Sequence, residues 1–213
     1  MNIKTMKTKL HFFFLFYIIS TSLLFSQTKK AKYSVVFTSV WNSTDHGILE
    51  KRSHWSKLVG VTHKTENTFW SLGEKATTGV KDIAEKGDNT IFNTEVTTAI
   101  SNFEAEKYID GNSLDTATGT ITIHDLIVDK DYPLLTLLSM IAPSPDWFIG
   151  VNSVKLTDDN SNWIPLISLD LFAYDAGTDS GVGYNSSNLV TNPFQNISSL
   201  KNVDPFTDKK LEH

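Results

Sequence analysis

Short runs of β-branched and aromatic residues, separated by polar and glycine-containing turns, dominate the hydrophobic pattern of this chain. Such runs are typical of strands. The pattern predicts strands at residues 33–41, 119–127, 148–156 and 163–171. In residues 119–127, alternation places Ile121, Ile123 and Asp125 on one face. Residues 134–141 are continuously apolar, which fits either a buried strand or a buried helix.

Two segments near the middle of the chain have a helical pattern instead. In residues 74–86, Ala76, Val80 and Ile83 recur at helical spacing, and Gly87 is suited to end the helix. A second helix is expected over residues 91–109. Several short strands with turns between them favour a mainly β protein. The fold class predicted is an antiparallel β-sandwich with one or two short helices inserted.

The N-terminus has the layout of a secretory signal peptide. Lys4, Lys7 and Lys9 precede an apolar stretch over residues 10–25, and the small residue Ser26 follows. The apolar run is shorter than the ~20 residues of a usual membrane span. We therefore expect a signal peptide at residues 1–26, a single domain at residues 27–213, and a secreted, extracellular product. An uncleaved membrane anchor is the alternative, and no later segment is apolar enough to span a membrane.

Composition narrows the classes of partner. The 213-residue chain has no cysteine and a formal net charge of −5. The absence of cysteine argues against small disulfide-stapled folds. The mild negative charge provides no basic surface for nucleic acid, so no nucleic-acid partner is expected.

Two segments carry candidate metal-binding chemistry. The first, PSPDW, holds Asp146 at a corner restricted by two prolines, and the second, DAGTDSG, places Asp175 and Asp179 in a loop with glycines at its bends. Carboxylates and carbonyls on curled loops suit Ca²⁺, which accepts several oxygen ligands in irregular geometry. The same Asp-Gly pattern also occurs in ordinary turns, in which Asp accepts hydrogen bonds from its own backbone. The residues alone leave both interpretations open.

The surrounding sequence resembles a known family. The stretch WSKLVGVTHKTENTFWSLGEKATTGVKDIAEKG, followed by MIAPSPDWFIGV and DLFAYDAGTDSG, closely resembles the spondin domain, the N-terminal module of the F-spondin and mindin family. The resemblance covers about residues 33–206 and implies an antiparallel sandwich similar to C2 domains. It also implies one calcium ion held by three aspartates, which match Asp146, Asp175 and Asp179 here. The family implies an extracellular or cell-surface partner, either protein or glycan, and no catalytic residues.

The chain departs from the family pattern at two places. His46-Gly47 stands where the family often has His-Pro, and the final apolar strand of the family is missing after Phe206. An unpaired edge would follow from the missing strand. Leu211-Glu212-His213 is either native sequence or the remnant of an expression tag.

Other residues suggest weaker alternatives. His46, His54 and His63 with Asp45 have no recognisable zinc spacing, so we expect a structural His63 and an exposed His46. A glycosidase pair of Glu85 and Glu95 needs a cleft that sequence cannot show; the simpler expectation is a buried or capped Glu85 and a surface Glu95. The tryptophans are expected in the core. Trp147 is the possible exception, because it adjoins a candidate metal ligand at a corner of the chain.

The leading functional hypothesis is a calcium-binding adhesion or recognition module that is not an enzyme, with its ligand unknown. A calcium-stabilised carbohydrate-binding module is the second hypothesis, and a secreted hydrolase is the third. A deep cleft with converging acids of perturbed pKa would favour the hydrolase.

Overall fold

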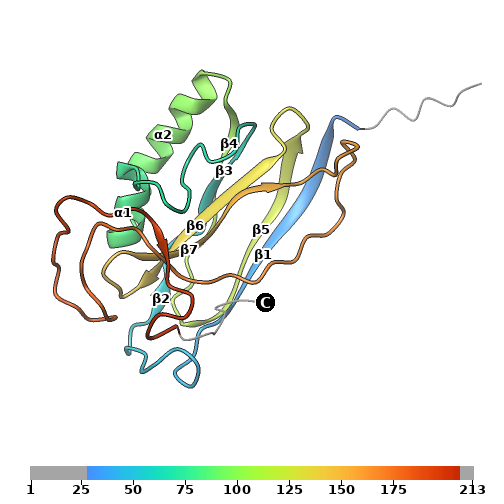
Figure 1. Cartoon of the computed structure of the whole chain (residues 1–213). Coiled ribbons are helices and arrows are strands. Elements are labelled where there is room, and N and C mark those ends of the chain that lie inside the picture. The colour runs from blue at the N-terminus through green and yellow to red at the C-terminus, as the bar shows by residue number, and fades with distance from the viewer. Residues whose placement is uncertain (1–27, 207–213) are drawn as a thin grey trace, which may run out of the picture.

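The structure is a computed structural model that describes residues 28–206. It contains two antiparallel sheets and two helices, which confirms the predicted β-sandwich with inserted helices (Figure 1). The expected signal peptide and the residues after Phe206 lie outside the described part of the chain.

The smaller sheet pairs β1 (Lys30–Val40) with β5 (Thr118–Asp129) along their whole lengths. A register shift between Tyr33 and Val35 interrupts the ladder, and on the opposite strand Asp125 has φ 54°. This irregularity turns Asp125 outward, so the buried positions change from Ile121 to Leu126 and Val128. The expected placement of Asp125 on the same face as Ile121 and Ile123 was therefore wrong, because simple alternation does not survive a β-bulge.

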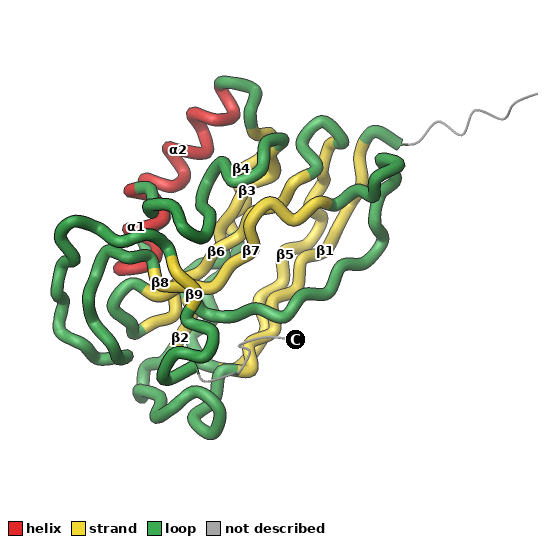
Figure 2. The backbone as a smooth tube through the Cα atoms, viewed as in Figure 1, coloured by secondary structure: helices red, strands yellow, loops and turns green. Residues whose placement is uncertain are grey.

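The larger sheet has the order β4-β3-β6-β7-β8-β9, with β2 beside β6 (Figures 1 and 2). Its strands are β2 (His54–Trp55), β3 (Val59–His63), β4 (Ala105–Asp110), β6 (Leu134–Ala142), β7 (Trp147–Lys155), β8 (Tyr174–Asp175) and β9 (Ser198–Ser199). Helices α1 (Thr78–Lys86) and α2 (Thr90–Ser101) pack on the face of this sheet that lies away from β1 and β5.

The position of β6 explains its continuous apolar sequence. All nine residues of this strand are buried, because one face meets the smaller sheet and the other meets the helices. Leu135, Leu137 and Ile141 join the inter-sheet core, whereas Leu138 joins the helix–sheet core with Val80 and Phe92. A strand covered on both faces is apolar along nearly its whole length. The segment is thus a buried strand, the first of the two structures that its sequence allowed.

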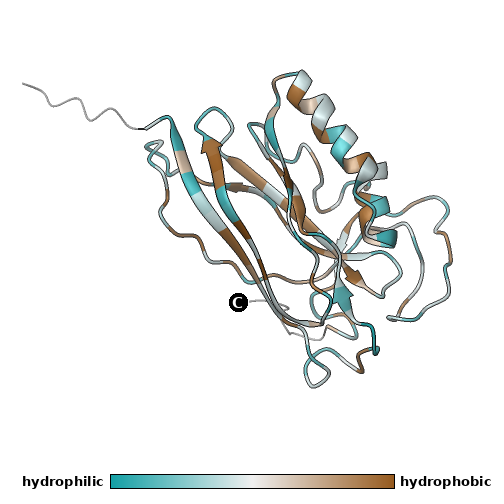
Figure 3. Cartoon of the chain, turned by 180° about the vertical axis from the view of Figure 1, so that it is seen from behind, coloured by the Kyte–Doolittle hydropathy of each residue, from teal (hydrophilic) through white to brown (hydrophobic). Residues whose placement is uncertain are grey.

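Helix α1 begins later than expected but ends where expected. Thr77 accepts a hydrogen bond from the Val80 N–H at 3.1 Å, which caps the first turn. Gly87 ends the helix with φ 66°, the left-handed conformation that glycine adopts easily. Both helices carry hydrophobic and hydrophilic residues, consistent with one covered and one solvent face (Figure 3).

One predicted helix boundary and one predicted strand were wrong. Helix α2 ends at Ser101, and residues 105–110 form β4, because pairing with β3 outweighs the local helical pattern. Residues 163–171 do not form a strand. Apart from a single bridge at Trp163, this segment crosses the open side of the sandwich as a loop, and Pro165 lacks the N–H that a ladder would need.

Candidate functional site

The corner between β6 and β7 buries Asp146 completely. Residues 143–146 form the turn, and the Ser144 hydroxyl accepts a hydrogen bond from the Trp147 N–H at 3.1 Å. Asp146 is 0 % exposed and immediately precedes the first residue of β7. Burial of a carboxylate is costly unless its oxygens find partners. The partners of the two Asp146 oxygens therefore decide what this position can do.

The β7–β8 ladder brings the two predicted segments together. Trp147 pairs with Asp175, although 28 positions separate them in the chain. The Asp146 carbonyl also accepts a hydrogen bond from the Ala176 N–H at 3.1 Å. The PSPDW corner and the DAGTDSG loop are therefore neighbours, as the calcium hypothesis requires.

One oxygen of Asp146 is fully engaged and the other is not. Oδ2 accepts hydrogen bonds from the Thr178 N–H at 2.7 Å, the Thr178 hydroxyl at 3.2 Å and the Asp179 N–H at 3.0 Å. Oδ1 is buried and has no hydrogen-bond partner. A buried oxygen without a partner is rare in folded proteins and calls for an explanation.

The pKa values of two aspartates reflect this burial. Desolvation raises the pKa of Asp146 to about 6, and the nearby charge of Asp175 adds to the effect, while the hydrogen bonds from Thr178 and Asp179 oppose it. Burial also raises the pKa of Asp175, against the opposing effects of the Gly177 N–H and the Trp147 indole. The charge of Asp175 thus disfavours ionisation of Asp146, and the charge of Asp179 disfavours ionisation of Asp175. A cation would relieve this repulsion.

Asp175 and Asp179 also organise their own loop. Asp175 Oδ1 accepts a hydrogen bond from the Gly177 N–H at 2.7 Å. Asp179 Oδ1 accepts one from the Gly181 N–H at 2.7 Å, and its Oδ2 accepts one from the Leu189 N–H at 2.9 Å. The self-capping turn proposed from the Asp-Gly pattern is therefore present, and it coexists with the convergence on Asp146.

Two glycines let the loop close against its surroundings. Gly177 has φ 75°, and a Cβ atom there would lie 2.5 Å from the Gln195 carbonyl oxygen. A Cβ on Gly181 would lie 2.6 Å from Cγ of Pro145. Only a residue without a side chain permits these approaches. At Gly181 the loop therefore packs directly on the corner that carries Asp146, and at Gly177 it packs on the segment at Gln195.

The donor atoms at this site are of the chemical type that calcium prefers, but their arrangement matches a calcium site less closely. The donors are carboxylates and loop carbonyls, the ligands that Ca²⁺ prefers, and Asp146 Oδ1 is an unpartnered oxygen among them. Both oxygens of Asp179 already accept backbone hydrogen bonds. Within residues 28–206, no group of three or more His, Asp or Glu side chains is close enough to hold a metal ion. Binding would therefore have to draw the three carboxylates closer together.

Sequence reasoning missed two contributors to this site. Thr178 supplies two of the donors to Asp146, and only its place between Asp175 and Asp179 could have indicated this role. The Leu189 N–H binds Asp179 from ten residues downstream, a contact that no local pattern marks.

Two expectations about other polar residues were wrong. His46 is 1 % exposed, because it folds back on the Asn42 backbone and packs against Phe206, with ring centroids 6.3 Å apart. Glu95 is half-buried and accepts hydrogen bonds from the Gly79 N–H and the Thr77 hydroxyl, both at 2.9 Å. It stabilises the start of α1 from the neighbouring helix.

The expectations for His63, Glu85 and the tryptophans agree with the structure. His63 is buried and binds the Thr136 hydroxyl at 2.8 Å, while Glu85 is half-buried and paired with Lys81 at 2.7 Å. Four tryptophans lie in the core and the fifth is half-buried: Trp41, Trp55, Trp70, Trp147 and Trp163. These tryptophans therefore form no exposed platform for a sugar ring.

Comparison with known proteins settles the family. The family model described as Spondin_N matches residues 31–211 of the chain. The chain belongs to the spondin N-terminal domain family. This spondin domain is 31 % identical to human Spondin-2 over 180 residues, which is 82 % of this chain and 54 % of that protein.

Longer relatives show a similar level of identity. Chicken Spondin-1 is 31 % identical over 189 residues, which is 84 % of this chain and 23 % of the relative. Spondin-1 from Xenopus laevis is 32 % identical over 181 residues, or 82 % of this chain and 22 % of the relative. The chain thus spans about half, or less, of the length of these proteins. In the described part of the spondin domain, no helix is long and apolar enough to cross a membrane.

Proposed function

We propose that this spondin domain is a secreted, calcium-binding recognition module of the adhesion type and has no enzymatic activity. The observation that carries the proposal is Asp146, a fully buried carboxylate whose Oδ1 has no partner and whose pKa is raised to about 6. At neutral pH this carboxylate is mostly ionised, and a cation is the simplest group that would stabilise a buried, unpartnered anion.

Asp146, Asp175 and Asp179 would hold the ion, together with carbonyls of the same loop. Calcium supplies positive charge that offsets the repulsion among the carboxylates. Thr178 orients Asp146, Gly181 lets the loop approach the corner, and Gly177 lets it pack against the backbone at Gln195. The loop over residues 175–195, with its exposed side chains Val182, Leu189 and Val190, would then be presented in one fixed shape.

The proposed partner is an extracellular or cell-surface component, either protein or glycan. The proposal also places the domain at residues 27–213, after a signal peptide at residues 1–26. It predicts that mass spectrometry of the secreted protein finds an N-terminus near Gln27. Secreted material that retains Met1 would contradict this part of the proposal.

Binding to candidate partners tests the functional proposal. The full chain would be applied to a glycan panel and to a panel of immobilised extracellular proteins, with calcium and with a chelator. Asp146→Asn is the test variant, and Asp158→Asn is its control, since Asp158 accepts hydrogen bonds from the Asn160 and Asn162 N–H groups in a polar turn after β7.

The recognition proposal expects binding that depends on calcium, is lost in Asp146→Asn and persists in Asp158→Asn. Binding to glycans alone would favour the carbohydrate-binding alternative. Binding that a chelator and Asp146→Asn both leave unchanged would separate recognition from the metal and contradict the proposal.

A further inference from the structure

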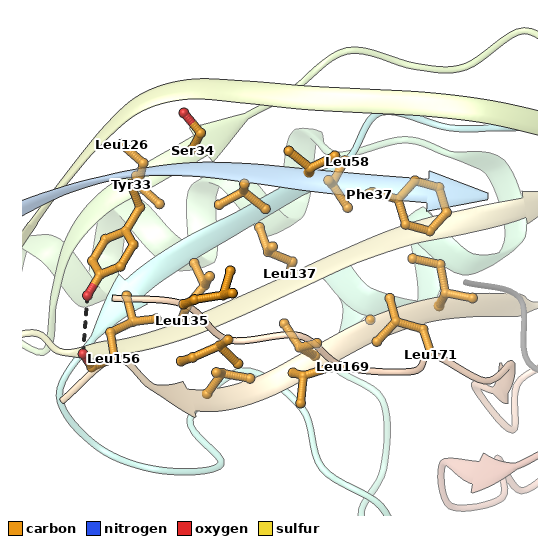
Figure 4. Close-up of a pocket in the computed structure, with 18 of the residues that line it drawn as sticks. Tyr33, Ser34, Phe37, Leu58, Leu126, Leu135, Leu137, Leu156, Leu169 and Leu171 are labelled. Carbon is orange, nitrogen blue, oxygen red and sulfur yellow. Dashed lines mark hydrogen bonds between the residues drawn. The ribbon is translucent and has the colours of Figure 1, made fainter. Parts of the chain in front are cut away.

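A cavity lies between the two sheets of the sandwich, away from the aspartate loop. Its volume is about 180 Å³, and β1, β6, β7 and the segment over residues 165–171 surround it (Figure 4). The side chains that form its interior are almost all aliphatic, among them Leu126, Leu135, Leu137, Ile149, Val154 and Leu171. Among the described residues, no carboxylate or cationic side chain lines it.

The polar groups at this cavity are already satisfied. The Tyr33 hydroxyl is directed at the carbonyl oxygens of Ile164 at 2.9 Å and Leu156 at 3.3 Å. Burial raises the pKa of Tyr33, so the phenol stays neutral. Ser34, the other hydroxyl of the lining, is exposed, and its side chain points away from Leu135 and Leu156 (Figure 4). Nothing in the interior therefore requires a polar ligand atom.

An apolar cavity of this size is poorly suited to water. A buried water needs two to four polar partners, and an aliphatic cavity of about 150 Å³ is known to stay dry and bind benzene. The lining side chains also lack dispersion contacts on their open side, which an apolar ligand would supply. The chemistry thus selects an uncharged hydrocarbon group several carbon atoms long.

The segment over residues 165–171 covers the cavity without being part of a sheet. It is fixed before the cavity by the Ile164 N–H, which donates to the Leu156 carbonyl at 2.9 Å. After the cavity, the Ala173 carbonyl accepts a hydrogen bond from the Leu200 N–H at 2.9 Å. Within the described residues, no backbone hydrogen bond joins residues 165–169 to a strand. Side-chain packing, mainly through Ile167 and Leu171, holds this cover in place.

The rim of the cavity is apolar as well. Leu166 is 81 % exposed, Val36 is 53 % exposed and Leu169 is 43 % exposed, and all three line the cavity. They extend the aliphatic surface from the interior outward. A hydrocarbon chain longer than the cavity would therefore remain in contact with apolar side chains as it leaves.

We propose that this cavity binds the alkyl chain of a single-chain amphiphile, which enters between the sheets beneath residues 164–171. The alkyl chain replaces the missing packing partners of Leu135, Leu137 and Ile149, and the polar end of the ligand stays in solvent at the rim, near the exposed Leu166 and Leu169. This site does not involve the aspartate loop, so its occupancy does not depend on calcium.

Fluorescence titration with dansylated undecanoic acid tests the proposal on the full chain. We expect saturable binding with a blue-shifted emission, unchanged by a chelator. Decanol should displace the probe and butanol should not, since only the longer alkyl chain fills the cavity. Val154→Phe places a ring in the cavity and should weaken binding by roughly tenfold or more, the equivalent of about two buried methylene groups.

A rim variant keeps the test decisive if Val154→Phe fails to fold. Leu166→Ser changes an exposed residue and should weaken binding several-fold. Val182→Ser is its control, because Val182 is 82 % exposed in the loop after Asp179, and this variant should bind as the unmodified chain does. Absence of saturable binding, loss of binding in chelator, or equal affinities of the two serine variants would overturn the proposal.

Discussion

Trp147 and Asp175 lie directly opposite each other across β7 and β8. This pairing places the residue before Trp147, the buried Asp146, against the loop that starts at Asp175. The Trp147 indole N–H is itself buried without a hydrogen-bond partner, although it is close enough to lower the pKa of Asp175. A single strand pair thus brings carboxylates from two distant parts of the chain close to each other.

The raised pKa of Asp146 predicts a specific pH dependence. Its folded-state pKa of about 6 exceeds the value near 3.9 expected in the unfolded chain. The contribution of this carboxyl to stability is therefore fully present below pH ~4 and is lost as the pH rises through about 6, by roughly 2–3 kcal/mol in the absence of metal. Chemical denaturation of the metal-free protein should show this loss, and Asp146→Asn should lack it.

The stabilisation of the protein by calcium should also depend on pH. Protons and the metal compete for Asp146, so the stabilisation by calcium should be larger near pH 7 than near pH 5. Parallel pH profiles for the unmodified chain and Asp146→Asn would show that this carboxyl does not carry the effect.

The close approach at Gly177 predicts that Gly177→Ala loses more unfolding free energy than a positive φ alone would cost. Gly177→Ala adds the cost of a positive φ and a Cβ 2.5 Å from the Gln195 carbonyl. Gly73→Ala is the matched control, since Gly73 has φ 82° but a Cβ there would have no other atom within 4 Å. The control should lose about 1 kcal/mol of unfolding free energy and Gly177→Ala clearly more, with weaker calcium binding. Equal losses in the two variants would contradict the packing described for the loop.

The carboxylate of Glu95 predicts a structural effect rather than a catalytic one. Glu95→Ala removes the acceptor for the Gly79 N–H and the Thr77 hydroxyl, and should cost roughly 1–2 kcal/mol of unfolding free energy. Glu104→Ala, at an exposed position after α2, should cost little. Denaturant melts of both variants provide the measurement, and a Glu95→Ala variant as stable as Glu104→Ala would refute the capping role.

Much of the fold could be predicted from local patterns. The strands around Phe37 and Ile149 have apolar residues that match the covered faces of the sheets, and Gly87 ends α1 as expected. The apolar run around Leu137 predicted burial but left strand and helix open. Residues 105–110 could not be assigned, because their strand conformation depends on pairing with β3. The segment at Pro165 was assigned as a strand for the opposite reason. Its residues are apolar because several of them pack over the sandwich, but the segment pairs with no neighbouring strand.

The candidate site was predictable in membership but not in arrangement. Sequence indicated Asp146, Asp175 and Asp179, and the structure brings their segments together. It could not indicate that Asp179 binds the Leu189 N–H, or that one oxygen of Asp146 stays unpartnered. Both facts depend on how the loop folds back on the corner, which is set by long-range packing at Gly177 and Gly181.

The thermal stability of the spondin domain with and without calcium tests the central claim most directly. With free calcium ~100-fold above its Kd, mass action adds about 2.7 kcal/mol, which corresponds to a rise in Tm of roughly 5–10 °C for a domain of this size. We predict this rise near neutral pH for the unmodified chain and for Asp158→Asn, and little or none for Asp146→Asn. A Tm of the unmodified chain that millimolar calcium leaves unchanged would contradict the account and leave the loop at Asp175 as a turn.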